Sequence, residues 1–343
     1  MKNKPLRVAI AGYGILGKVR HLTIQKFSSF DVVAISDLLI NEMVLEDSIK
    51  KYQNYDDMLE DSSLSYDVVF VCLTNNFNSL ATIHALKKGA HVFCEKPPGR
   101  NVQDILDVIK VASQYTGQKL MYGFNHRYHS SIIEANRIIQ NKELGEVINL
   151  RGVYGKSRLI TFNQSDWRTS REIAGGGVLL DQGIHMVDMM RLFAGEFDEV
   201  NSFIENSFWN YDVEDNAYSI MRTKDGKVAM LNSSATQWRH KFNLDITLER
   251  GSLILSGILS GSKSYGAETI TIVTADPEND LGNPVETTTR YNIDESWYLE
   301  IKDFLDCILE DNIVTSSTAN DALNTMKLVQ KIYSADKKWQ SKL

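Results

Sequence analysis

The chain has 343 residues, which at roughly 150 residues per domain predicts two domains with separate cores. Apolar residues make up 43% and charged residues 24%, values that exclude a mainly disordered, collagen-like or coiled-coil protein. The formal net charge of −7 has the wrong sign for a nucleic-acid-binding protein, and without a long apolar run or a signal-peptide core we expect a cytoplasmic protein with no membrane partner.

The first part of the chain, to about residue 140, alternates short apolar runs with segments of helical period. The runs are apolar throughout, as expected for parallel strands covered by helices on both faces. This pattern predicts βαβ units and therefore an α/β domain with a doubly wound parallel sheet. We expect its strands at Leu6–Ala11, Val32–Ser36, Val68–Leu73, Ala90–Cys94 and Lys119–Phe124.

A GxGxxG pattern follows the first predicted strand directly. Gly12 allows a tight turn, Gly14 lets backbone amides approach a pyrophosphate, and Gly17 permits close helix–strand packing. Asp37 lies 20 residues after Gly17, at the end of the second predicted strand, where a carboxylate accepts hydrogen bonds from the adenosine ribose. A 2′-phosphate would meet a like charge there, and the two following leucines cannot neutralise it, so we expect NAD rather than NADP. The cofactor-binding residues expected in the turn are Gly12, Tyr13, Gly14, Ile15, Leu16 and Gly17.

The fourth predicted strand is followed by Glu95, Lys96 and Pro97. Ligands of doubly wound sheets bind at the carboxyl ends of the strands, so Lys96 is a candidate site residue. The competing interpretation is an ordinary solvated lysine.

After Gly145 the pattern changes to many short strands, several of them joined by tight turns such as Asp225-Gly226. It predicts a second domain with a large, mainly antiparallel open sheet, over residues 126–343, after a dinucleotide-binding domain over residues 1–125. The two closing helices could pack back on the first domain. We expect strands at Glu146–Tyr154, Val200–Glu205, Ala217–Arg222, Val228–Thr236, Phe242–Glu249, Ser252–Leu255, Thr269–Val273 and Thr287–Ile293, and helices at Gly177–Ala194, Ser296–Glu310 and Thr318–Ala335.

The helix that starts near Gly177 carries Asp181 and His185, which at positions i and i+4 project from one face. Histidine is suited to proton transfer near neutral pH, and a nearby carboxylate can orient its ring. Asp188 could reach the same ring. The competing interpretation is a helix-capping acid and a core histidine.

His126 and His129 are three residues apart, a spacing that could suit a metal ion. No cysteine or carboxylate partner completes such a site, so we expect no metal. Solvent-side or helix-capping histidines are the favoured interpretation.

The glycine turn, the Glu95-Lys96-Pro97 run and the Asp181/His185 helix occur in this order across nearly the whole chain. This set resembles the glucose–fructose oxidoreductase / inositol 2-dehydrogenase (Gfo/Idh/MocA) family. The resemblance implies an N-terminal Rossmann domain and a C-terminal α+β domain with an open antiparallel sheet. It also implies NAD(P)-dependent transfer of hydride to or from a sugar, cyclic polyol, sugar acid or nucleotide-sugar.

The resemblance further implies roles for single residues. Lys96 would bind the reacting hydroxyl and the nicotinamide region, Asp181 would orient the substrate, and His185 would transfer the proton. Where the family has Thr-Pro-Asn and then a histidine, this chain has Asn75 in place of the proline and Asn78 in place of the histidine, which changes the expected loop but not the cofactor. The implied set also includes Thr74, Asn76 and Glu95 at the cofactor, and Trp167 and Arg168 at the substrate.

Chemistry at a secondary alcohol agrees with these roles, because a base must take the hydroxyl proton and a cation can stabilise the alkoxide. One rival is an NAD-dependent epimerase or glycosidase of the same family, with no net redox change. Another is a non-catalytic dinucleotide-binding regulator, which would need only the glycines and Asp37. The presence of Lys96, Asp181 and His185 together favours an enzyme.

Two features predict partners. Five basic residues and one acid, Asp166, lie between Arg151 and Arg171. Either they form a solvated loop and strand face, or they bind an anionic sugar, with Arg168 as the best candidate. The open sheet leaves a face for a second subunit, so we expect a homodimer or homotetramer.

Overall fold

The computed structural model describes residues 4–160, 166–276, 278 and 282–341. It divides into two compact units, each described by itself here. The first comprises Met1–Phe124, Glu172–Gly175 and Trp297–Leu323, and the second Asn125–Arg171, Gly176–Ser296 and Asn324–Leu343. Within the described ranges, no helix combines the length and apolar character needed to cross a membrane.

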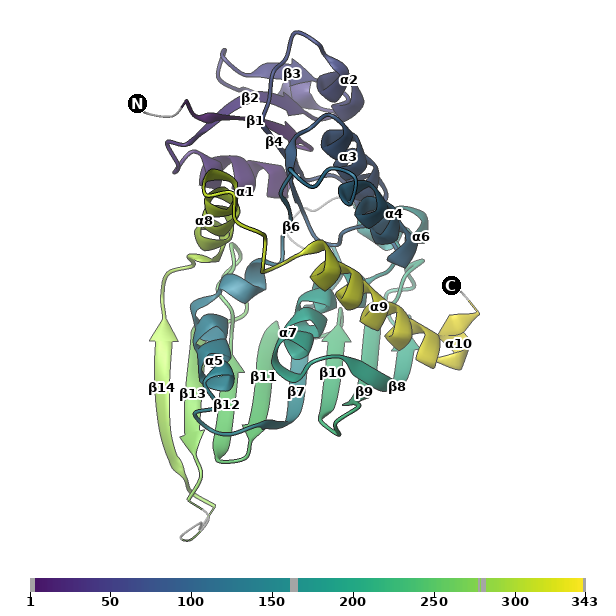
Figure 1. The fold of residues 1–343 in the computed structure, drawn as a ribbon. Helices are drawn as coiled ribbons and strands as arrows, with labels where there is room; N and C mark the ends of the chain where they lie inside the picture. The colour runs from purple at the N-terminus through teal and green to yellow at the C-terminus, as the bar shows by residue number, and fades with distance from the viewer. Residues whose placement is uncertain (1–3, 161–165, 277, 279–281, 342–343) are drawn as a thin grey trace. The chain divides into compact units, whose positions relative to one another are not determined.

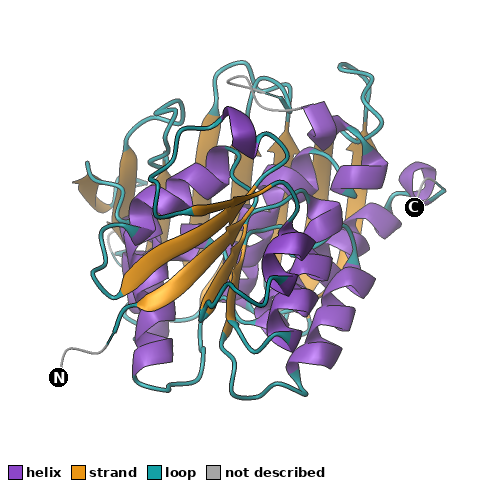
Figure 2. Cartoon of the chain, turned by 90° about the horizontal axis from the view of Figure 1, so that it is seen from above, coloured by secondary structure: helices purple, strands orange, loops and turns teal. Residues whose placement is uncertain are grey.

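The first unit is built on a six-stranded sheet in the order β3-β2-β1-β4-β5-β6, in which every pair is parallel. This confirms the predicted doubly wound sheet. Helices α1 and α8 cover one face and α3 and α4 the other (Figures 1 and 2). The elements are β1 (Leu6–Ala11), α1 (Ile15–Ile24), β2 (Phe30–Ser36), β3 (Lys50–Tyr52), α2 (Tyr55–Glu60), β4 (Val68–Val71), α3 (Asn75–Lys87), β5 (His91–Cys94), α4 (Val102–Ala112), β6 (Leu120–Tyr122) and α8 (Ser296–Leu309).

The core of the first unit lies where α8 meets the sheet. Phe70 of β4 and Phe93 of β5 are fully buried. Phe304 of α8 packs edge-on against both rings, at centroid distances of 6.1 and 5.5 Å. A helix from near the end of the chain therefore completes the hydrophobic core of the first sheet.

The second unit holds an eight-stranded sheet in the order β14-β13-β12-β11-β7-β10-β9-β8. Only β7 and β10 pair in parallel, so the predicted large, mainly antiparallel sheet is confirmed. Helices α5 and α7 lie on one face (Figure 1). The elements are α5 (Ser130–Gln140), β7 (Val147–Gly155), α7 (Ile184–Ala194), β8 (Phe197–Glu205), β9 (Asn216–Thr223), β10 (Val228–Ser234), β11 (Lys241–Leu248), β12 (Gly251–Ser256), β13 (Glu268–Thr274), β14 (Val285–Tyr291), α9 (Ala319–Ala335) and α10 (Lys337–Gln340). The short helix α6 (Arg171–Ala174) belongs, apart from Arg171, to the first unit.

Candidate functional site

The glycine turn of the first unit is packed on one side and open on the other. A Cβ atom on Gly12, whose φ is +91°, would lie 2.4 Å from the carbonyl oxygen of Cys72, and one on Gly17 would lie 2.1 Å from that of Gly12. A Cβ on Gly14 would meet no atom within 4 Å. The turn is thus fixed by the strand behind it, while the backbone at Gly14 stays open to a phosphate group.

Asp37 ties the end of β2 to this turn. Its carboxylate accepts hydrogen bonds from the backbone amides of Tyr13, at 2.8 Å, and Leu39, at 3.0 Å. The α1 helix starts at Ile15, with Leu16 next in its first turn, and carries no acidic residue there, so its amino end can attract an anion. The open glycine, the helix start and the acid together fit a dinucleotide.

The two asparagines that depart from the family pattern, Asn75 and Asn78, lie in α3 after β4, and both make hydrogen bonds to backbone carbonyls. Thr74 precedes α3 and its hydroxyl donates to Asn76 Oδ1 at 2.7 Å. The buried Asn75 donates to the carbonyl of Ala174 at 2.7 Å, and the buried Asn78 donates to that of Pro97 at 3.0 Å. Asn78 therefore supports the chain directly after Lys96.

Lys96 is half-buried and follows β5, and its peptide bond to Pro97 is cis. Its neighbour Glu95 is buried and accepts from Arg20 Nε at 2.5 Å, while Arg20 Nη1 donates to Glu300 at 2.6 Å. The guanidinium lies between the rings of Phe93 and Trp297, at 4.4 and 4.5 Å from their centroids. The Glu95 carboxylate is thus committed to a buried ion network, and its expected role at the cofactor stays a prediction.

Asp181 of the second unit lies between two cations. Lys156 Nζ donates to its Oδ2 at 3.0 Å and Arg168 Nε donates to its Oδ1 at 3.1 Å. The Arg168 guanidinium also covers the ring of Trp167, at 4.4 Å from the centroid. The structure therefore brings Arg168 and Asp181 together. It adds Lys156, a buried lysine directly after β7, which the strand-end argument used for Lys96 could have found.

His185 is buried and stacks on His126, with ring centroids 3.7 Å apart and an interplanar angle of 14°. His126 Nε2 lies 3.0 Å from the hydroxyl of Tyr154. Burial raises the pKa of Tyr154 well above its usual value, with smaller contributions from Tyr265 and Asp181, so the phenol keeps its proton. Sequence reasoning missed His126 and Tyr154 as neighbours of His185.

The interpretation of His126 and His129 as solvent-side residues is wrong, because both are buried. His129 stands at the N-cap position of α5, as the helix-capping alternative has it, but its side chain makes no capping hydrogen bond. His129 immediately precedes α5, and its Nδ1 lies 2.8 Å from Glu268 Oε2. This partner is 139 residues away in the sequence, so spacing along the chain could not reveal it. Among the described residues, no group of three or more His, Cys, Asp or Glu is arranged to hold a metal ion.

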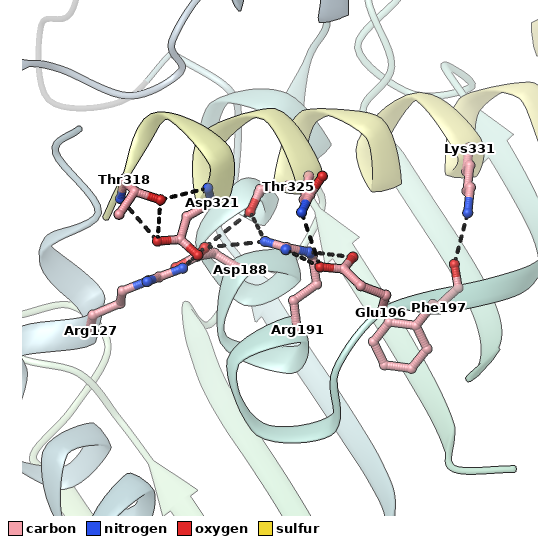
Figure 3. A network of polar contacts seen from close by, with 10 residues as sticks. Arg127, Asp188, Arg191, Glu196, Phe197, Thr318, Asp321, Thr325 and Lys331 are labelled. Atoms are coloured by element: carbon pink, nitrogen blue, oxygen red, sulfur yellow. Dashed lines mark hydrogen bonds and ion pairs between the residues drawn. The ribbon is translucent and has the colours of Figure 1, made fainter. Parts of the chain in front are cut away.

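The suggestion that Asp188 reaches the ring of His185 is also wrong. Both of its carboxylate oxygens accept from Arg127, at 2.7 Å each, and Oδ1 also accepts from Thr325 of α9 at 3.0 Å. Figure 3 shows this network, in which Arg191 donates to Thr325 and Glu196. Asp188 thereby joins α7 to the turn that carries His126, one residue before Arg127.

The predicted single helix from Gly177 to Ala194 starts with a π-helical turn, η4 (Leu179–Gly183), and continues as α7. The hydroxyl of Ser233 in β10 donates to the carbonyl of Val178 at 3.1 Å. A Cβ on Gly183 would lie 2.5 Å from that hydroxyl oxygen. A side chain from the sheet thus contacts the backbone at the widened turn, and the helical pattern of the sequence does not reveal it.

The basic residues from Arg151 to Arg171 contact acids and a ring from elsewhere in the second unit; residues 161–165 lie outside the described residues. Lys156 and Arg168 share one acid, Asp181. The pairs are Arg151 with Asp245 at 3.7 Å, Lys156 and Arg168 with Asp181, Arg158 over the ring of Trp209 at 5.4 Å, and the Arg171 backbone amide with Asp212 at 2.8 Å.

Two family models match the chain. The model described as oxidoreductase family, NAD-binding Rossmann fold, matches residues 6–124, and the GFO/IDH/MocA C-terminal domain matches residues 132–254. D-glucoside 3-dehydrogenase of Escherichia coli K12 is 30% identical over 68% of this chain and 71% of that protein. Myo-inositol 2-dehydrogenase of Thermotoga maritima is 24% identical over 88% and 87%. Levoglucosan dehydrogenase in complex with NADH and levoglucosan shares the fold, with a TM-score of 0.85 at 19% identity over 98% of each chain.

Proposed function

Because the chain belongs to the GFO/IDH/MocA family of oxidoreductases, with their NAD-binding Rossmann fold, we propose that it moves hydride between NAD and a carbon of a sugar or cyclic polyol. The relatives named above are a glucoside, an inositol and a levoglucosan dehydrogenase. All three substrate classes are polyhydroxylated rings. The observation that carries the proposal is the side-chain set around Asp181 and His185 in a chain that also has the dinucleotide turn.

Each candidate site residue has its own role in the proposed reaction. The open backbone at Gly14, the start of α1 and the Asp37 carboxylate would hold NAD, which when bound accepts or supplies the hydride. His185 takes the hydroxyl proton during oxidation and returns it during reduction. Lys96 stabilises the negative charge that develops on the same oxygen. Asp181, held by Lys156 and Arg168, binds neighbouring hydroxyls of the ring.

An anionic substrate receives less support from the structure than from the sequence. Lys156 and Arg168 share Asp181, which leaves one positive charge in excess in this group. Of the other three basic residues, Arg151 pairs with Asp245, Arg158 lies over the Trp209 ring, and the Arg171 guanidinium donates to the backbone carbonyl of Asp212. We therefore propose a neutral sugar or polyol as the main substrate, with at most a modest preference for a sugar acid.

The direct test is NADH formation with D-glucosides, levoglucosan, inositols and the matching sugar acids. A dehydrogenase forms NADH in proportion to substrate oxidised. An epimerase or glycosidase would convert substrate without net NADH, and a regulator would bind NAD and convert none of the panel. Either outcome would overturn the proposal.

We further propose that the protein works in the cytoplasm as a homodimer or homotetramer joined through the second sheet. The face of this sheet opposite α5 and α7 exposes five large apolar side chains on β8, β9 and β10, namely Phe203, Tyr218, Ile220, Val228 and Met230. Phe203 pairs across the strands with Tyr218, and Ile220 with Met230, so they form one patch. Sedimentation at micromolar concentration should show an oligomer that Ile220→Asp dissociates and that Thr288→Asp, on β14 outside the patch, leaves intact. A wild-type monomer would contradict this.

A further inference from the structure

Glu214 lies just before β9 and is completely buried. Its Oε2 accepts from the backbone amide of Gly177 at 2.8 Å, and its Oε1 accepts from that of Leu179 at 2.9 Å. The hydroxyl of Tyr333, in α9, donates to the same Oε1 at 2.7 Å. One carboxylate from the sheet side thus caps the first turn of the helix that carries Asp181 and His185.

The same contacts explain why glycines, Gly176 and Gly177, stand directly before this helix. A Cβ on Gly177 would lie 2.1 Å from the backbone carbonyl oxygen of Glu214. A Cβ on Gly176 would lie 2.3 Å from the hydroxyl oxygen of Tyr333. Glycine at both positions therefore leaves the space in which Glu214 and Tyr333 approach the start of the helix, and a larger residue at either position would collide with them.

Both side chains of the cap, Glu214 and Tyr333, are buried. Burial raises the pKa of Glu214, while the hydrogen bonds from Tyr333 and the two amides act in the opposite direction. Burial also raises the pKa of Tyr333 well above its usual value, so the phenol remains a hydrogen-bond donor. The cap therefore depends on the geometry of three donors around one carboxyl group.

We propose that Glu214 is a positioning residue for the reaction, because it holds the helix in the register that places Asp181 beside Lys156 and Arg168. This rests on the proposed function. The widened turn η4 begins at Leu179, and the backbone amide of this residue donates a hydrogen bond to Glu214. The carbonyl of the preceding residue, Val178, accepts a hydrogen bond from Ser233. If a π-turn relaxes to an α-helical turn, the residues on one side of it rotate about the helix axis by about 100°, which is the rotation per residue in an α-helix. Such a rotation would carry Asp181 away from its two cations while leaving the body of α7 in place.

Three single variants of the full-length protein test the proposal, assayed with the best substrate among a D-glucoside, levoglucosan and myo-inositol. Glu214→Gln keeps the shape but places an NH₂ group against a backbone donor. Tyr333→Phe removes one donor and keeps both amide contacts. The control is Asp336→Asn, another buried carboxylate of the second unit, which accepts from the amides of Ile204, Lys338 and Trp339 at 2.8–3.0 Å and does not contact η4.

We expect Glu214→Gln to lower kcat by about 10- to 100-fold, the scale of a misplaced orienting group, and to raise KM because Asp181 also binds the ring hydroxyls, with NAD affinity unchanged. Tyr333→Phe should lower kcat by a smaller factor, and it keeps the proposal testable if Glu214→Gln does not fold. Asp336→Asn should lower thermal stability and leave kcat unchanged. An unchanged kcat in both cap variants, or an equal loss in Asp336→Asn, would overturn the proposal.

Hydrogen exchange gives a readout that does not depend on activity. In Glu214→Gln the backbone amides of residues 177–183 should exchange faster, while the rest of the second unit stays as protected as in the wild type. If the wild type converts no sugar of the panel, the proposed function fails while the exchange data still show whether the cap holds the helix. If exchange in 177–183 is unchanged in the variant, the cap proposal fails whatever the substrate.

Discussion

The two units build their parts of the chemistry by different means. In the first, the cofactor site is made mainly of backbone: an open glycine, a helix start and one acid that accepts hydrogen bonds from two backbone amides. In the second, side chains do it, and each has a partner far away in the sequence. Lys156 is 25 residues from Asp181, Glu214 is 37 from Gly177, and Arg127 is 61 from Asp188. A site made of backbone has a short sequence signature, whereas a site made of paired side chains has none until the fold is known.

The largest effect should come from His185→Ala in the second unit. Removing a positioned acid/base costs about 10²- to 10⁴-fold in rate, so kcat should fall by that order while the Kd for NAD stays the same. His129→Gln is the matched control, because His129 is as buried but is bonded to Glu268. Steady-state kinetics with NADH absorbance decide it, and a wild-type kcat in a folded, NAD-binding His185→Ala protein would refute the assignment.

A smaller effect is expected from Asp37→Asn in the first unit. Hydrogen bonds to a charged group contribute about 1.5–3 kcal/mol, so the affinity for NAD should fall by roughly 10- to 150-fold. The difference between the affinities for NAD and NADP should become smaller, because the variant no longer repels the 2′-phosphate of NADP. Asp31→Asn, an exposed acid on the same strand, is the control. Titration of both cofactors measures the gap, and tighter binding of NADPH by the wild type would contradict the prediction.

The buried ion network of the first unit should make stability depend on pH. Burial raises the pKa of Glu300 to about 8, with Arg20 acting against this shift. The folded protein then holds a proton that the unfolded chain releases, so stability should fall as pH rises from about 5 to 8, by at most about 1.4 kcal/mol per pH unit. Glu300→Gln should flatten this dependence. Urea unfolding at several pH values measures it, with exposed Glu310→Gln as a variant expected to keep the wild-type slope.

The smallest effect should come from Arg168→Ala. Because Lys156 still binds Asp181, the loss should lie at the low end of the range for a hydrogen bond to a charged group, about 1.5 kcal/mol, or roughly 10-fold in kcat/KM. The loss should be similar for a neutral sugar and for its acid. A selective loss for the acid alone would show that Arg168 binds the substrate's charge, as the sequence suggested. Arg171→Ala, which removes a guanidinium that donates to the backbone carbonyl of Asp212, serves as the control.

The sequence predicted most of what is periodic or local. Both sheets, the glycine turn and Asp37 follow from short patterns, since strand period and turn chemistry act over a few residues. The π-turn could not be predicted, because the side chain that contacts it, Ser233, lies on a distant strand. For α8 the sequence left packing on the first domain as a possibility, because an amphipathic pattern shows that a face is buried but not against what. The partners of His126 and Asp188 were missed for the same reason.

The position of β7 has a consequence for how the protein is made. This strand is the first of its sheet to leave the ribosome, yet it lies in the interior, between β10 and β11. Neither partner exists until synthesis has passed residues 228–234 and 241–248. Until then both of its edges carry unpaired amides and carbonyls, the kind of surface that recruits other chains. The second unit should therefore fold late and through distant contacts, which is slow, and rapid overproduction should aggregate chains stalled before β11.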